Sequence, residues 1–305
     1  MNHSNMAQPQ PNNGPTDDAR TDTQHEQNTQ MARAVEANWG AAWASLGQLR
    51  HEPRSLVDDT PTMLRVVTPG LPETLMNMVM RYREPAPVTA ATIEDVIAPF
   101  RRYGLPFQWW LIRDDAPTGL REHLYAVGMR SWGGATMMYL TLLHWNPSNP
   151  GYPPAPPEVS YHRLTTADEL SDALRIISRV FDVPPYPMSR WTNENPAFTL
   201  YQAHWGNQPV ATVATLPAGE TIGVYHVATL PEARRRGIAG NLLLLALRDA
   251  QAAGYGAATL TATPAGQQLY TQLGFGVCGL LEQWMTGPRL TDDLIRHGDP
   301  LARGE

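Results

Sequence analysis

A run of small and basic residues in the C-terminal half has the composition of an anion-binding loop. The run is Pro231-Glu232-Ala233-Arg234-Arg235-Arg236-Gly237-Ile238-Ala239-Gly240, between an apolar stretch that predicts a strand and one that predicts a helix. The first N–H groups of a helix have no partner within the helix, and its dipole favours an anion there. Small residues let a ligand approach the backbone, and the arginines add positive charge. We therefore predict that this loop holds a diphosphate.

Other phosphate-binding loops fit this sequence less well. All 23 basic residues are arginine, which excludes a P-loop lysine, a lysine nucleophile and a Schiff base. The run Gly254-Tyr255-Gly256 lacks a third glycine and follows the predicted helix, so we interpret it as a helix end and turn. The simplest alternative for the arginine loop is a solvated start of a surface helix. Arginine is normally unfavourable at the positive end of a helix, which argues against that alternative.

A second motif follows about thirty residues later, Leu269-Tyr270-Thr271-Gln272-Leu273-Gly274-Phe275. Gly274 is expected to end a helix in the left-handed region, and Phe275 to begin the next strand. Tyr270 then lies on the last helical turn, where its hydroxyl can face a site.

Together these motifs carry a family resemblance. Arg234-x-x-Gly237-x-Ala239 and Leu269-Tyr270-x-x-x-Gly274-Phe275, with a strand ending Val227-Ala228-Thr229 before them, resemble the acetyl-CoA-binding core of GCN5-related N-acetyltransferases, the GNAT family. The resemblance covers roughly Val159 to Met285. It implies an acetyltransferase that moves the acetyl group of acetyl-CoA, its co-substrate, to a primary amine.

The resemblance also implies roles for individual residues. Backbone groups of the strand pair with the pantetheine arm of the coenzyme and help to polarise the thioester carbonyl; these are Val227, Ala228 and Thr229. The pyrophosphate is held by the loop and the helix start, which comprise Arg234, Arg235, Arg236, Gly237, Ile238, Ala239 and Gly240. Tyr270 matches the tyrosine that protonates the departing coenzyme thiolate.

The sequence departs from the family pattern at two positions. Thr263 stands where relatives often carry asparagine, and Gly223 stands where histone-modifying members carry a glutamate base. The general base is therefore open between a water relay and several side chains, which are His226, Tyr225, Glu220, Glu194 and His204. An acceptor pocket is expected between the domains and residues 181–196.

Composition limits the other classes of function. The net charge of −6 and the pI of about 5.8 give no positive field for nucleic acid. No apolar run is long enough to cross a bilayer, and no His, Cys and Asp cluster has the spacing of metal ligands. The single cysteine, Cys278, lies in an apolar stretch and is interpreted as a buried thiol. We expect a cytoplasmic protein without a metal.

The chain divides into four predicted regions. Residues 1–30 contain almost no apolar side chains and are expected to be a disordered tail. Residues 31–146 form the first folded unit, and a proline-rich linker occupies 147–158. Residues 159–305 form the catalytic GNAT domain.

Periodicity predicts an α/β fold with a mixed sheet. In the first unit we expect helices at 32–47, 72–82, 93–103 and 119–127 and strands at 63–67, 107–112 and 136–143. In the second we expect strands at 159–164, 199–205, 209–216, 221–230, 257–261 and 275–285, a helix after Asp168, and helices at 237–253 and 264–273.

The first unit shows a fainter version of the second. Leu124-Tyr125-Ala126-Val127-Gly128-Met129 is similar to the Leu269 to Phe275 motif but one residue shorter, and no Arg-x-x-Gly-x-Ala precedes it. The resemblance therefore implies an acyl-CoA N-acyltransferase fold in two tandem GNAT-like domains, the first of them degenerate. The alternative function is a non-catalytic acetyl-CoA-binding sensor or scaffold, which would keep the loop and lack turnover.

Overall fold

The computed structural model describes residues 17–49, 52–83, 87–147, 154–181 and 197–286. In the first half the elements are α1 (Asp17–Ala44), η1 (Ser45–Gln48), β1 (Leu56–Asp59), β2 (Leu64–Val67), η2 (Thr74–Met76), β3 (Met78–Met80), α2 (Ala90–Tyr103), β4 (Gln108–Ile112), η3 (Arg113–Asp115), α3 (Leu120–Ala126) and β5 (Arg130–Thr141). In the second they are β6 (Val159–Arg163), α4 (Ala167–Phe181), β7 (Thr199–Trp205), β8 (Gln208–Ala218), β9 (Thr221–Thr229), η4 (Pro231–Ala233), α6 (Ile238–Ala252), β10 (Ala257–Ala262), α7 (Pro264–Gln272) and β11 (Gly276–Met285).

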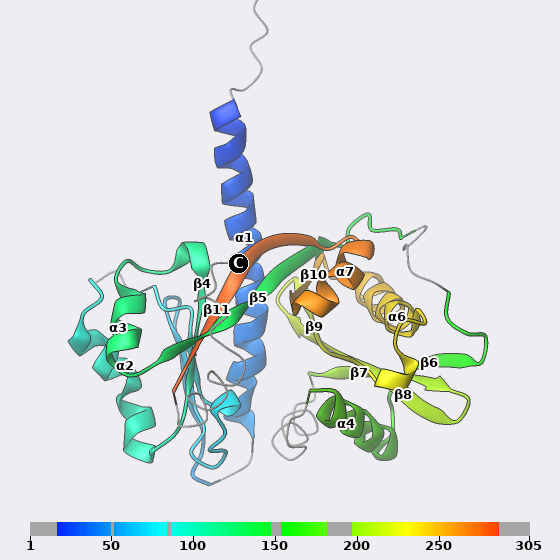
Figure 1. The fold of residues 1–305 in the computed structure, drawn as a ribbon, viewed down its shortest axis with the longest axis horizontal. Helices are drawn as coiled ribbons and strands as arrows, with labels where there is room; N and C mark the ends of the chain where they lie inside the picture. The colour runs from blue at the N-terminus through cyan, green and yellow to red at the C-terminus, as the bar shows by residue number, and fades with distance from the viewer. Residues whose placement is uncertain (1–16, 50–51, 84–86, 148–153, 182–196, 287–305) are drawn as a thin grey trace, which may run out of the picture.

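The described strands form one continuous sheet of 11 strands in the order β1-β2-β3-β4-β11-β5-β10-β9-β8-β7-β6. The last strand, β11, lies between β4 and β5 of the first half and is antiparallel to both. In turn, β5 lies between β10 and β11 of the second half. The two halves therefore exchange strands, and the centre of the sheet belongs to both (Figure 1).

The same order of elements occurs twice along the chain. In each half, two parallel strands are joined by a crossover helix, β3-α2-β4 and β9-α6-β10. A short helix and a long strand follow each crossover, as α3-β5 and α7-β11. The strand order is symmetrical about the β11–β5 pair except for the additional edge strand β6, so the second half repeats the topology of the first.

Helices cover both faces of the sheet. Successive strand residues point to opposite faces of the sheet and belong to different hydrophobic cores. Val224 packs with α6 and α7, whereas Tyr225 packs with α1 and α4. Likewise Trp109 packs with α2 and α3, and Trp110 with α1. Thus α1 and α4 lie on one face, and α2, α3, α6 and α7 on the other. Cys278 belongs to the α1 face, where burial raises the pKa of its thiol to about 12.

The long helix α1 joins the two halves. It contacts β2 and β5 of the first half and β8, β9, β10 and β11 of the second. Figure 1 shows its first turns projecting past the sheet and its remaining turns crossing the middle. Residues 17–30 were expected to be disordered, and this is wrong because they are the start of α1. Residues 1–16 lie outside the described residues.

Most predicted elements are present, with one wrong assignment. Residues 72–82, predicted as a helix, contain η2 and the buried strand β3. The apolar spacing of Leu75, Met78 and Val79 suits a helix, but Met78, Val79 and Met80 are all fully buried between β2 and β4. A strand that is buried on both faces loses the alternation by which strands are recognised. The short edge strand β1 was not predicted.

A buried carboxylate also joins the halves. Glu282 of β11 is 5% exposed and accepts hydrogen bonds from Arg121 Nε at 2.9 Å and Arg113 Nε at 3.0 Å. Burial by itself raises the pKa of Glu282, but the two guanidinium groups outweigh burial and hold the pKa below its ordinary value. The ionised carboxylate therefore stabilises the position of β11 between the first-half strands β4 and β5.

Replacing this carboxylate should weaken the folded state in a pH-dependent way. We expect Glu282→Gln to lower the free energy of unfolding at pH 7 by about 1–3 kcal/mol, because charge-assisted bonds become neutral ones. A depressed folded pKa stabilises above the ordinary value of 4.5 and ceases to do so as the pH falls through the folded pKa. The difference between wild type and variant should therefore shrink below pH 4.5 in urea titrations, and a constant difference would contradict this role.

Strand exchange also predicts that the first half cannot fold alone. A fragment of residues 31–146 lacks β11, so that β4 and β5 would be separated by an empty strand position. Unpaired backbone groups on both strands make that state unfavourable. We expect no cooperative thermal transition by circular dichroism, whereas the full chain should show one. A sharp transition in the fragment would contradict the need for β11.

Candidate active site

The predicted loop is a helix start whose N–H groups are open. Helix α6 begins at Ile238 after Gly237, and no side chain caps it. Its first N–H groups have no partner within the helix. Both Arg235 and Gly237 adopt left-handed backbone conformations, with φ of 58° and 71°. This conformation is costly for arginine, and the loop retains it directly before the open helix end.

The loop borders a cavity of about 460 Å³. From the loop side the cavity is lined by Thr229, Ala233, Arg234, Arg235, Gly237, Ile238, Ala239 and Gly240. From the α7 side it is lined by Ala265, Gln268, Leu269 and Gln272. The structure thus brings together most of the predicted pyrophosphate residues and adds a second wall from α7. Sequence reasoning missed that wall, although it lies on the same helix as Tyr270.

Two predicted arginines are engaged with the protein. Arg234 Nε donates to the carbonyl oxygen of Thr229 at 3.0 Å, which ties the loop to the end of β9. Arg236 does not line the cavity, and its guanidinium stacks over the Trp205 ring, 4.8 Å from the ring centroid. Of the three arginines, Arg235 is therefore the best placed to face an anion. Arg236 is better described as a packing residue.

Strand β9, which precedes the loop, contains a β-bulge and separates from its neighbour β10 after Gly223. Thr212 of β8 pairs with Ala228 and Ala214 with Tyr225, so Val213 faces two residues, His226 and Val227. His226 has a φ of 51°, which is rare for a residue other than glycine. On its other side β9 pairs with β10 only from Thr221 to Gly223. Among the described residues, the β10 side of residues 224–229 has no strand partner.

The opening between β9 and β10 is where Val227, Ala228 and Thr229 lie. Thr229 also lines the loop cavity, so the open strand edge and the open helix end are continuous along the chain. Ala228 is buried with its β8 side paired to Thr212. An extended ligand arm could therefore use the remaining side of this strand.

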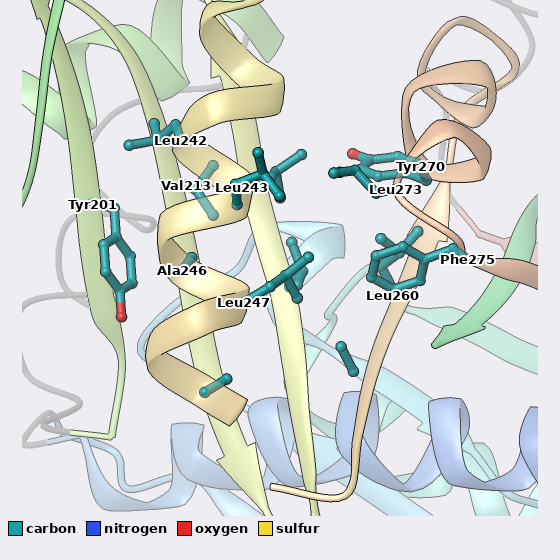
Figure 2. Packing of buried hydrophobic residues seen from close by; sticks show 14 of the residues in the cluster. Tyr201, Val213, Leu242, Leu243, Ala246, Leu247, Leu260, Tyr270, Leu273 and Phe275 are labelled. Carbon is teal, nitrogen blue, oxygen red and sulfur yellow. The ribbon is translucent and has the colours of Figure 1, made fainter. Parts of the chain in front are cut away.

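Tyr270 lies in α7 next to the cavity-lining Leu269, but it does not itself line the cavity. Figure 2 shows its hydroxyl end pointing from α7 toward Leu243 of α6. The side chain is 8% exposed, and burial raises the pKa of Tyr270 to about 12. The hydroxyl is therefore protonated at neutral pH and can serve as a proton donor. Its ring packs edge-on against Phe275, with 6.0 Å between centroids, in the shared core of α6 and α7.

The candidate bases are far from equivalent. Tyr225 donates its hydroxyl to Asn38 Oδ1 at 2.6 Å, and burial raises its pKa. His204 lies on β7 beside Gln202, and Glu220 lies in the turn before β9. His226 occupies the bulge directly before Val227, and burial lowers the pKa of its imidazole to about 4, so it is neutral at pH 7. Glu194 and most of the expected acceptor segment, 182–196, lie outside the described residues.

The matching helix start in the first half, that of α2, is capped. Thr89 caps α2 by accepting from Thr92 N at 3.2 Å, while Thr92 Oγ1 accepts from Thr89 N at 2.9 Å. Tyr125, the counterpart suggested by sequence, is 60% exposed and stacks under Arg130. The start of α2 is thus closed by its own residues, whereas the start of α6 has no side-chain cap.

The described residues contain neither a cluster of metal ligands nor a helix that could span a membrane. No group of three or more His, Cys, Asp or Glu residues there could hold a metal ion. None of the helices described is both long and apolar enough to span a bilayer.

Residues 166–275 match the model of the acetyltransferase (GNAT) family. This segment contains the uncapped helix, the bulged strand and Tyr270. A search of curated proteins found no match to the chain.

Solved structures match the whole fold at low sequence identity. A GCN5-related N-acetyltransferase from Kribbella flavida is 18% identical with a TM-score of 0.63, covering 84% of this chain and 97% of its own. One from Sphaerobacter thermophilus is 17% identical with a TM-score of 0.55, covering 75% of this chain and 81% of its own.

A tandem GNAT protein from the clavulanic acid biosynthesis pathway is 13% identical with a TM-score of 0.52. It covers 82% of this chain and 95% of its own. These matches extend well beyond the 166–275 segment and agree with the repeated topology of the sheet. Residues 166–275 are therefore similar to the GNAT acetyltransferase family, and the chain has the fold of two tandem GNAT-like units.

Proposed function

We propose that the protein is an N-acetyltransferase that uses acetyl-CoA to acetylate a primary amine at a site in its second half. The observation that carries the proposal is the continuity of two open backbone edges. The uncapped start of α6 offers N–H groups to a pyrophosphate, and the bulged end of β9 offers an unpaired strand edge to the pantetheine arm. Thr229 belongs to both, so one extended ligand could use them together.

The residues of this site suggest how the reaction proceeds. The amine attacks the acetyl carbonyl directly, forming the new C–N bond while the C–S bond breaks. Backbone N–H groups near Val227 would stabilise the developing oxyanion, as fixed donors do in other acyl transfers. Tyr270, protonated at neutral pH, would give its proton to the departing sulfur. His226 or water would take the proton that the amine loses.

We also propose that the first half is a degenerate copy that does not bind the coenzyme. Its support is the capped α2, where Thr89 and Thr92 satisfy each other's backbone donors. A further support is Tyr82, which is buried against Trp109 of β4, with 5.3 Å between ring centroids. This aromatic pair fills the core beside β3 and β4.

The alternative is a non-catalytic acetyl-CoA sensor or scaffold. Gly223, where some relatives carry a glutamate base, has no room for a side chain because Asn38 and Tyr225 occupy that space. This favours the alternative to the extent that the reaction needs a carboxylate there. The hydroxyl of Tyr270, which is protonated at neutral pH, favours catalysis.

One experiment separates the two functions. Acetyl-CoA binding is measured by calorimetry, and free coenzyme thiol is then followed with panels of amines, peptides and antibiotics. Saturable binding with amine-dependent thiol release supports the enzyme. Binding without release with any acceptor supports the sensor, and no binding would reject both.

A further inference from the structure

The space above Gly223, on the α1 face of the sheet, is occupied by neighbouring side chains. A Cβ built on Gly223 would lie 1.9 Å from Asn38 Oδ1 and 2.5 Å from Tyr225 Cε2. Both distances are far below van der Waals contact, so any side chain at 223 would displace its neighbours. The space is thus filled by a residue of α1, which precedes the first half of the sheet.

Asn38 is fully buried and hydrogen-bonded on both sides of its amide. It accepts from the Tyr225 hydroxyl at 2.6 Å, and its Nδ2 donates to Thr221 Oγ1 at 3.1 Å and to the Leu216 carbonyl at 3.3 Å. Thr221 in turn donates to the Ala218 carbonyl at 2.9 Å. One side chain therefore links the end of β8, the start of β9 and the residue before the bulge.

These contacts end where the strand leaves its neighbour. Pairing of β9 with β10 stops at Gly223, so beyond this point one side of β9 has no ladder to hold it. Tyr225 is two residues further, and His226 begins the bulge with a positive φ. The hydrogen bond to Asn38 holds Tyr225 in place just before His226, the residue with the strained backbone. Strained backbone persists only when its surroundings hold it in place.

We propose that Asn38 is a positioning residue through which α1 fixes the bulged segment of β9 for the acetyl and pantetheine end of the coenzyme. This inference rests on the proposed function. It assigns to α1 a role at the second-half site that its place in the sequence does not suggest. Asn38 acts through Tyr225 and the backbone, and it need not touch the ligand.

Two probes separate this role from a general loss of stability. Acetyl-CoA would use both the α6 start and the β9 segment, whereas adenosine 3′-phosphate 5′-diphosphate, its nucleotide part, would use the α6 start alone. In Asn38→Ala we expect the affinity for acetyl-CoA to fall about 10-fold and that for the nucleotide to change less than about twofold. Calorimetry with the full-length chain measures both.

Asn77, in the first half of the chain, provides a matched control. It is also fully buried, and its Nδ2 donates to the carbonyls of Leu71 and Glu73, both at 3.0 Å. Asn77→Ala should therefore cost comparable stability in the first half. Because it is remote from β9, the affinities for both probes should stay within about twofold of wild type.

Two more variants test the same contact if Asn38→Ala folds poorly. Tyr225→Phe removes only the hydroxyl that Asn38 accepts, and Gly223→Ala forces Asn38 out of its place. Each variant should selectively lower the affinity for acetyl-CoA. The effects of Gly223→Ala and Asn38→Ala on this affinity should not be additive in the double variant, because both substitutions remove the same interaction.

The outcomes are distinct. Selective loss of acetyl-CoA affinity in these variants and not in Asn77→Ala supports the proposal. An equal loss of affinity for both probes, or no loss of affinity in folded variants, overturns the proposal while leaving the proposed function intact. Failure of the wild-type chain to bind acetyl-CoA overturns the proposed function and this inference with it.

Discussion

Gly237→Glu is expected to abolish measurable acetyl-CoA binding, a loss of more than about 100-fold in affinity. Gly237 precedes the uncapped α6 in a left-handed conformation and lines the loop cavity. A glutamate there would place a side chain and a negative charge where the pyrophosphate is expected. Calorimetry on the folded variant measures the loss, and circular dichroism checks the fold.

The substitution also strains the backbone, which a control must separate from the charge. Gly219 lies in the β8–β9 turn with a φ of 56°, and nothing lies within 4 Å of a Cβ built on it. Gly219→Glu therefore carries similar strain and the same charge at the other end of β9, and it should bind acetyl-CoA normally. Wild-type affinity in folded Gly237→Glu would remove the loop from the site.

Tyr270→Phe is expected to lower kcat by about 10²- to 10⁴-fold while coenzyme affinity barely changes. The substitution keeps the ring that packs against Phe275 and removes only the hydroxyl, which is protonated at neutral pH. General acid catalysis usually contributes a factor of this size. The measurement requires saturating acetyl-CoA, so that the rate reports chemistry or product release instead of coenzyme capture.

Tyr201→Phe is the matched control, because Tyr201 is another buried tyrosine in the same core cluster (Figure 2). Both substitutions should lower the free energy of unfolding by about 1 kcal/mol, whereas only Tyr270→Phe should lower kcat. Near wild-type kcat in folded Tyr270→Phe would contradict a role as proton donor. A pre-steady-state burst in wild type would show instead that product release limits the rate.

Local sequence was sufficient to predict the start of α6 and the elements around it. The helix at Ile238 and the strand before Pro231 have strong apolar patterns, and Gly274 adopts the left-handed conformation expected at its helix end. These features depend on interactions within a few residues along the chain, so they can be recognised there. The repeated Leu-Tyr motif likewise indicated a second GNAT-like unit, and the topology repeats accordingly.

Local patterns could also mislead, as in residues 72–82. Met78 to Met80 read as part of a helical stripe, but the positions between β2 and β4 require a strand. Residues 17–30 read as a polar tail because their helix buries little apolar surface of its own. For residues 72–82 the neighbouring strands β2 and β4 decide the conformation.

Tertiary structure alone decided how the halves share one sheet and one site. The exchange of β5 and β11 joins residues more than a hundred positions apart, as in the pair Leu281 and Ala135. Nothing in the sequence around Gly223 indicates that Asn38 fills the space above it. The two residues are 185 positions apart, and their contact forms only when the whole sheet has formed. Pairing and burial between distant segments depend on the complete fold, whereas motifs and helix boundaries depend on neighbouring residues.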